Sequence, residues 1–225
     1  MSDAAVEYRI ALGLWLNDRL SRNPSVLRIP TDKLDLFVAR DFLDPEECAG
    51  LIALIEAERM PSQLLAPSED PDFRTSESCN LDPEQPLVGR VEDKITGLLG
   101  IQPELGETIQ GQRYTIGQQF KPHHDFFHTT GDYWPEMERT GGQRTWTAMI
   151  FLNVPAEGGQ TAFPEADIKV SPRPGNLLAW NNLDARGEPN HNTLHQGCPV
   201  LAGAKYVVTK WYRERPWSAS DIRTY

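Results

Sequence analysis

The ten residues QFKPHHDFFH, at positions 119–128, hold three of the five histidines in the chain. On a β-strand or at its end, successive side chains point to opposite faces. His123 and Asp125 are therefore expected to project together, while His124 points away. An imidazole and a carboxylate would then lie side by side. A lone His-x-Asp pair is also common on protein surfaces, so this pair alone does not establish a metal site.

A third potential ligand, His195, lies in TLHQGCPVLAGAKYVVTKWY, residues 193–212. Two histidines and one carboxylate leave coordination positions open, which is typical of non-haem Fe(II) sites that react with oxygen. A structural zinc site is a poor alternative, because such sites usually have four protein ligands including cysteine. Lys205 begins an apolar strand ten residues after His195. A lysine there is costly unless an anion meets it, which favours a dicarboxylate co-substrate.

The composition is that of a soluble globular domain. The chain has 225 residues, is 39% hydrophobic and carries a formal net charge of −10. This charge disfavours a general nucleic-acid binder and favours solubility or a basic partner. The N-terminus lacks the positive charge and apolar core of a secretory signal, and no apolar run is long enough to span a membrane. We expect a cytoplasmic protein with reduced cysteines and without nucleic-acid or membrane partners.

Helices are predicted mainly in the first half of the chain. The first covers residues 4–20, with an apolar face formed by Val6, Ile10, Leu14 and Trp15. A second begins at Asp44-Pro45, where aspartate can cap and proline fits the first turn. A long polar loop is expected over residues 61–86, and a third helix then ends at Gly100.

From residue 107 onward, short runs rich in β-branched and aromatic residues alternate with Gly, Pro and Asn. This pattern predicts an α+β fold with helices packed outside a β-sandwich or open barrel. We expect a single domain over residues 1–225, with a helical part at about 1–106 and a β core at about 107–213.

The β region resembles the catalytic domain of prolyl 4-hydroxylases. The matching stretches are QRYTIGQQFKPHHDFF, QRTWTAMIFLNVPAEGGQTAFP, VSPRPGNLLAW and LHQGCPVLAGAKYVVTKWY, in the order and near the spacings of that family. DLFVARDFLDPEECAGLI and RTSESCNL extend the resemblance over most of residues 34–213. It implies a double-stranded β-helix, or jelly-roll, with the N-terminal helices packed on one sheet.

The resemblance also implies a function. The family uses Fe(II), O2 and 2-oxoglutarate to hydroxylate a prolyl residue in a peptide or protein, with release of succinate and CO2. Ascorbate (vitamin C) would restore over-oxidised iron. Two alternatives stay open: hydroxylation of another residue or a small metabolite, and a non-catalytic jelly-roll sensor or binding module. The complete ligand set and the lysine argue against the second.

Site residues follow from the same resemblance. It assigns the iron ligands to His123, Asp125 and His195. It assigns the contacts to 2-oxoglutarate to Lys205, Thr161 and Tyr114. The contacts to the peptide substrate are assigned to Phe120, Arg144 and Trp211. The family usually has tyrosine where Phe120 stands, and GGQT replaces the more common GGET. The stretch 128–143 is a candidate insertion that could reshape the substrate groove. His124, His128 and His191 are not expected to be ligands.

Overall fold

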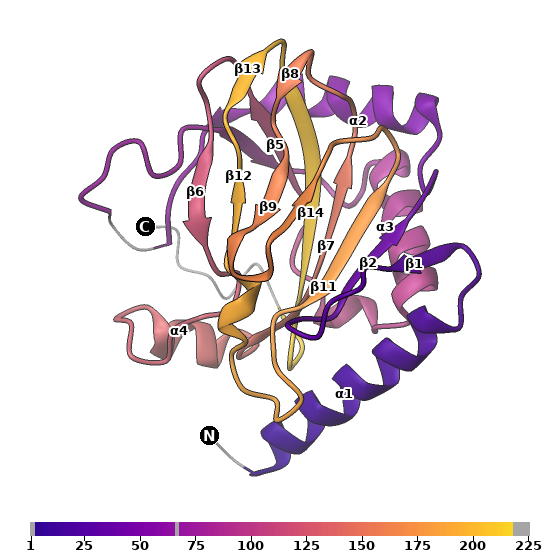
Figure 1. The fold of residues 1–225 in the computed structure, drawn as a ribbon, viewed down its shortest axis with the longest axis vertical. Coiled ribbons are helices and arrows are strands. Elements are labelled where there is room, and N and C mark those ends of the chain that lie inside the picture. The colour runs from indigo at the N-terminus through magenta and orange to yellow at the C-terminus, as the bar shows by residue number, and fades with distance from the viewer. Residues whose placement is uncertain (1–2, 66–67, 218–225) are drawn as a thin grey trace.

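The computed structural model describes residues 3–65 and 68–217, and it consists of two facing antiparallel sheets with helices on one side (Figure 1). The large sheet has the order β1 (Val26–Arg28), β2 (Leu36–Ala39), β11 (Leu177–Asn181), β7 (Arg144–Phe151), β14 (Lys205–Arg213), β5 (Gln110–Tyr114), β4 (Glu77–Asn80) and β3 (Met60–Pro61). The small sheet has the order β10 (Ile168–Val170), β9 (Thr161–Phe163), β12 (His195–Gly197) and β6 (Phe120–His123). A two-stranded sheet pairs β13 (Val200–Ala202) with β8 (Glu157–Gly158). The predicted jelly-roll is confirmed.

Alternation along β7 explains why the molecule has two layers of core. Trp146, Ala148 and Ile150 join a hydrophobic cluster with helix residues, whereas Met149 and Phe151 face the small sheet in a second cluster. A strand buried on both faces is accordingly almost continuously apolar. The polar exceptions on its inner face are Thr145 and Thr147, of which Thr147 is fully buried beside the ligand cluster.

Three long helices, α1 (Asp3–Ser21), α2 (Pro45–Glu58) and α3 (Pro86–Leu99), cover the outer face of the large sheet (Figure 1). Helix α2 begins as predicted: the Asp44 carboxylate accepts from the Glu47 amide, and the Glu47 side chain accepts from the Asp44 amide. This reciprocal capping box satisfies two amides that the helix itself leaves unpaired. Helix α3 ends at Gly100 in the left-handed conformation, also as predicted.

The predicted apolar face of α1 is wrong. The residues that enter the core are Leu12, Leu16 and Leu20, whereas Leu14 and Trp15 are 65% and 47% exposed. Apolar residues occur on several sides of this helix, so periodicity did not single out one face. Its packing against β1 and α3 decides which face is buried.

Two segments expected to be irregular contain regular structure. The stretch 61–86 is not a continuous loop, because β4 within it pairs with β5; residues 66 and 67 lie outside the described ranges. The insertion 128–143 includes a short helix, α4 (Trp134–Arg139). Single turns of 3-10 helix, η1 (Pro103–Leu105), η2 (Pro164–Ala166) and η3 (His191–Thr193), complete the fold.

Strands also occur before residue 107, so the N-terminal part supplies both edges of the large sheet, β1 and β2 at one and β4 and β3 at the other, as well as the helices. That residues 1–225 form one domain stays a prediction, since both ends of the chain lie outside the described ranges. Within those ranges, no helix has the combination of length and apolar character needed to cross a membrane.

Candidate active site

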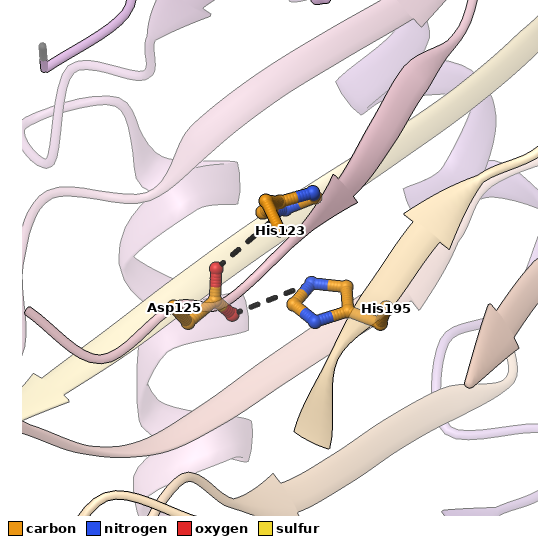
Figure 2. Close-up of side chains that lie close together, drawn as sticks. All are labelled: His123, Asp125 and His195. Atoms are coloured by element: carbon orange, nitrogen blue, oxygen red, sulfur yellow. Dashed lines mark ion pairs between the residues drawn. The ribbon is translucent and has the colours of Figure 1, made fainter. Parts of the chain in front are cut away.

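His123, Asp125 and His195 converge at one end of the small sheet (Figure 2). His123 is the last residue of β6, Asp125 follows two residues later, and His195 begins β12. The Asp125 carboxylate lies between the two rings: Oδ1 is 3.9 Å from His123 Nε2, and Oδ2 is 3.8 Å from His195 Nε2. Within the described part of the chain, this is the one group of three such side chains whose ligand atoms all lie within 4.8 Å of one another.

Backbone carbonyls fix the orientation of both imidazoles. His123 Nδ1 lies 2.8 Å from Lys121 O, and His195 Nδ1 lies 2.9 Å from Thr193 O. A carbonyl can only accept, so each Nδ1 carries the proton and each Nε2 presents its lone pair to the site. This is the arrangement that metal-binding histidines usually have.

The site also favours the protonation states that a metal requires. Burial, followed by the nearby His195, lowers the pKa of His123 well below its usual value. Burial alone would raise the pKa of Asp125, but the two imidazoles, Arg144 and the Thr147 hydrogen bond lower it overall. A neutral imidazole and an ionised carboxylate are the forms that bind metal. The donor set therefore fits Fe(II).

The ligand cluster lines a cavity that also contains Tyr114, Phe120, Thr161, Lys205 and Trp211. Lys205 and Trp211 share this cavity because they lie on the same face of β14, as the spacing predicted. The structure thus brings together all of the predicted site residues except Arg144.

Lys205 is a buried cation at the far wall of the cavity, 2% exposed. Its Nζ lies 3.4 Å from Thr161 Oγ1 and near the rings of Tyr114 and Phe151. Burial lowers its pKa to about 8, and no carboxylate of the described residues forms an ion pair with it. A desolvated ammonium beside a hydroxyl is a ready binding site for a carboxylate.

Tyr114 and Phe120 form two further walls. The Tyr114 hydroxyl donates to Gln112 Oε1 at 2.7 Å. The Phe120 ring stacks on His123, with centroids 3.5 Å apart and planes 13° apart. Phe120 therefore keeps the ring contact of the tyrosine expected in the family, without its hydroxyl.

Arg144 lies beside the cavity instead of in it. Its Nε and Nη2 each donate to the Glu107 carboxylate at 2.7 Å, and its guanidinium lies 4.2 Å from the centre of the Trp211 ring. These bonds use two of the five N–H groups of the guanidinium. In this structure Arg144 supports the Trp211 ring, and its assignment as a contact to the peptide stays a prediction.

The segment RTSESCNL and the preceding Phe73 cover the Phe120 side of the site, through residues to which sequence reasoning gave no separate role. Arg74 donates to Gln110 Oε1 at 2.8 Å and covers the Phe120 ring at 4.7 Å. The Phe73 ring meets Phe120 edge-on, and the Phe73 carbonyl accepts from the Lys121 amide at 2.8 Å. The family-like motif was the signal for Arg74. Glu107 and Thr147 had no comparable signal, because their roles depend on partners distant in the sequence.

The remaining histidines lie outside the ligand cluster, as predicted. His124 points away from Asp125, stacks on Phe126 and lies 3.2 Å from the His191 carbonyl through its Nε2. His128 and His191 meet the His124 ring edge-on at its exposed side.

Comparison with known proteins agrees with this geometry. The model of the 2OG-Fe(II) oxygenase superfamily matches residues 109–213. Prolyl 4-hydroxylase 1 of Arabidopsis thaliana is 30% identical over 91% of this chain and 79% of its own length. Probable prolyl 4-hydroxylase 8 of the same plant is 34% identical over 78% and 67%.

A solved structure gives the same result in three dimensions. The viral collagen prolyl hydroxylase of Paramecium Bursaria Chlorella virus-1, in its complex with 2OG, superposes with a TM-score of 0.62 at 27% identity. The match covers 78% of this chain and 94% of the viral one. The sequence relatives and this structure together show that the chain belongs to the prolyl 4-hydroxylase family of Fe(II)- and 2-oxoglutarate-dependent dioxygenases.

Proposed function

We propose that this protein hydroxylates a prolyl residue in a peptide or protein substrate, with conversion of 2-oxoglutarate to succinate and CO2. One observation carries the proposal: a His-Asp-His cluster and a buried lysine that has no ion-pair partner among the described residues line the same cavity. The relatives are named as prolyl hydroxylases, which favours proline over another residue or a small metabolite.

His123, Asp125 and His195 would hold Fe(II), which with 2-oxoglutarate supplies the activation of O2. Lys205 and Thr161 would bind the distal carboxylate of 2-oxoglutarate. The apolar walls around them keep water from this ion pair and so strengthen it. Tyr114 would donate a second hydrogen bond to the same end, after releasing Gln112.

Trp211 and Phe120 would present flat apolar faces to the substrate ring. Arg144, fixed by Glu107, keeps the Trp211 ring in place. These residues position the substrate carbon and contribute no proton transfer of their own. Positioning of this kind converts an encounter into a reactive geometry.

Two further expectations belong to the proposal. Ascorbate would sustain turnover by reducing iron that has been oxidised without product formation. The protein would act in the cytoplasm, in line with its free cysteines, which include the buried Cys48 and Cys79.

The decisive experiment offers proline-rich peptides to the purified protein with Fe(II), 2-oxoglutarate and ascorbate. Mass spectrometry would follow the gain of one oxygen atom, and amino-acid analysis would identify hydroxyproline. The Asp125→Ala variant is the control. Product on another residue or on a small metabolite would redirect the substrate assignment. Absence of succinate under all conditions would favour the non-catalytic binding module.

A further inference from the structure

A chain of buried hydrogen bonds leads away from the Asp125 carboxylate into the large sheet. Thr147 Oγ1 donates to Asp125 Oδ2 at 2.7 Å, and Asn182 Nδ2 donates to Thr147 Oγ1 at 2.9 Å. Thr147 and Asn182 have no exposed surface, and Asp125 is 5% exposed. Water has no access to replace either bond.

The backbone holds the two polar residues rigidly. Thr147 lies in the middle of β7, between two paired strands. Asn182 extends β11 by one residue: its amide donates to Thr145 O at 2.8 Å, and its carbonyl accepts from the Asn190 amide at 3.0 Å. It follows Trp180 by two positions, so its side chain lies on the same inner face of the sheet.

The single proton of the Thr147 hydroxyl sets the order of donors and acceptors along these hydrogen bonds. A threonine hydroxyl has one proton to donate. Because Asn182 donates to the hydroxyl oxygen, that proton is directed toward the carboxylate. The Asp125 Oδ2 is then held by a hydrogen bond, whereas Oδ1 has no hydrogen-bond partner in residues 3–65 and 68–217.

The presence of an asparagine at position 182 is not explained by the stability of the fold. Its Oδ1 is buried without a hydrogen-bond partner in the same part of the chain. A buried polar atom of this kind destabilises a fold and calls for another explanation. An amide at this position is explained if its Nδ2 group, which donates to Thr147, has a role at the active site.

We propose that Thr147 and Asn182 are positioning residues that fix the Asp125 carboxylate for metal binding, with Oδ1 as the oxygen left for the metal. The inference rests on the proposed role of Asp125 as a metal ligand. Groups that orient a ligand carboxylate in this way typically change metal affinity by about 10- to 100-fold when they are removed.

The test is a Co(II) titration of the metal-free protein, followed by the visible absorption of bound Co(II). Thr147→Val removes the hydroxyl at nearly constant volume and should weaken Co(II) binding by about 10-fold or more. Thr147→Ser keeps the hydroxyl and should bind nearly as wild type. Thr145→Val is the matched control. It removes another buried hydroxyl from the same strand, but that hydroxyl donates to Tyr212 O instead of a ligand.

The Asn182→Leu variant tests whether Asn182 and Thr147 act through one connected chain of hydrogen bonds or through independent effects on packing. It should weaken Co(II) binding in the wild-type background and have no further effect when Thr147 is already valine, because the chain is then interrupted. Additive losses would overturn the connection between the two residues. Wild-type affinity in a folded Thr147→Val protein would overturn the proposal. If that variant does not fold, wild-type affinity in Asn182→Leu would do the same.

The Asp125→Ala variant distinguishes a failure of the ligand assignment from a failure of the positioning role. If it binds Co(II) as tightly as wild type, the ligand assignment itself fails. If it loses Co(II) while Thr147→Val retains full affinity, only the positioning role fails.

Discussion

His123 and His195 are direct cross-strand partners: the residue that ends β6 is paired in register with the residue that begins β12. Their ring centroids are 4.2 Å apart. Asp125 follows on the same face as His123, so two neighbouring strand ends carry all three ligands. A site on adjacent strands of one sheet is held more precisely than one assembled from separate loops.

Replacing Asp125 by alanine is expected to abolish Fe(II) binding and succinate formation, because the site loses its only carboxylate. The fold should remain, since the sheets are held by apolar contacts elsewhere. Fe(II) affinity, succinate and the thermal melting temperature can be measured on one preparation. Wild-type activity in Asp125→Ala would refute the ligand assignment.

Lys205 is expected to lower the stability of the free protein and to be essential for the binding of 2-oxoglutarate. Lys205→Met should raise the 2-oxoglutarate requirement by orders of magnitude with little change in Fe(II) binding. The same change should raise the melting temperature of the free protein, because a pKa of about 8 against an ordinary 10.5 corresponds to about 3 kcal/mol of destabilisation at neutral pH. An unchanged affinity for 2-oxoglutarate would show that another group binds its distal carboxylate.

The affinity for 2-oxoglutarate should fall as the pH rises above about 8, where Lys205 in the free enzyme loses its proton. The protonated amine binds the carboxylate, so binding above this pH requires proton uptake. The stability of the free protein should change in the opposite direction. Burial destabilises the folded state fully below pH 8, and this penalty disappears as the pH rises toward the ordinary lysine pKa of 10.5.

These two pH trends can be measured by calorimetry of 2-oxoglutarate binding and by thermal melts over the same pH range. Lys205→Met is the control and should show neither trend. If Lys205→Met showed the same two pH trends, other titrating groups would be responsible for them.

Local chemistry was sufficient to predict the helix ends and the pairing of His123 with Asp125, whereas the complete ligand set with His195 came from the resemblance to prolyl 4-hydroxylases. Strand parity separates His123 and Asp125 from His124, and it places Lys205 and Trp211 on one face of β14. Asp44-Pro45 and Gly100 act on their own helices, and tertiary contacts did not override them. Features of this kind depend on residues close together in the sequence.

Other features depend on partners far away in the chain. Glu107 binds Arg144 and Arg213, and neither partner follows from the sequence around Glu107. Helix α4 is too short to form alone, and Arg213 holds it by donating to Met137 O at 2.7 Å. Likewise, residues 77–80 have modest strand propensity and become β4 because β5 offers a partner.

The segment before β4 should act as a movable cover whose apolar contact matters more than its surface ion pair. Phe73→Ala removes the edge contact with Phe120 and should raise the KM for peptide and the rate of proteolysis within residues 68–76. Asp70→Asn breaks the partly exposed pair with Lys121 and should change both little. Wild-type KM and proteolysis in Phe73→Ala would show that the segment is held by its backbone bonds alone.

Trp211 and Arg144 should differ in how their loss affects the enzyme. Trp211→Ala should lose hydroxylated product while retaining much of the succinate formation, because the substrate is misplaced while the metal and 2-oxoglutarate sites remain. Arg144→Ala should produce the same uncoupling and also a less stable protein. Removing one partner of a buried ion pair costs about 3–5 kcal/mol, although the remaining Arg213 contact will reduce this value.

A double variant, Arg144→Met with Glu107→Gln, separates these two effects of Arg144. It removes the carboxylate charge that Arg144 neutralised and leaves glutamine able to accept from Arg213. Because the buried Arg213 then loses its own ion pair with Glu107, only part of the lost melting temperature should return. Uncoupling should persist, because the support of the Trp211 ring is still missing. Product and succinate measured side by side give the ratio. If Trp211→Ala lost both equally, that residue would support the iron site or the fold, and the substrate groove would have to lie on another face of the cavity.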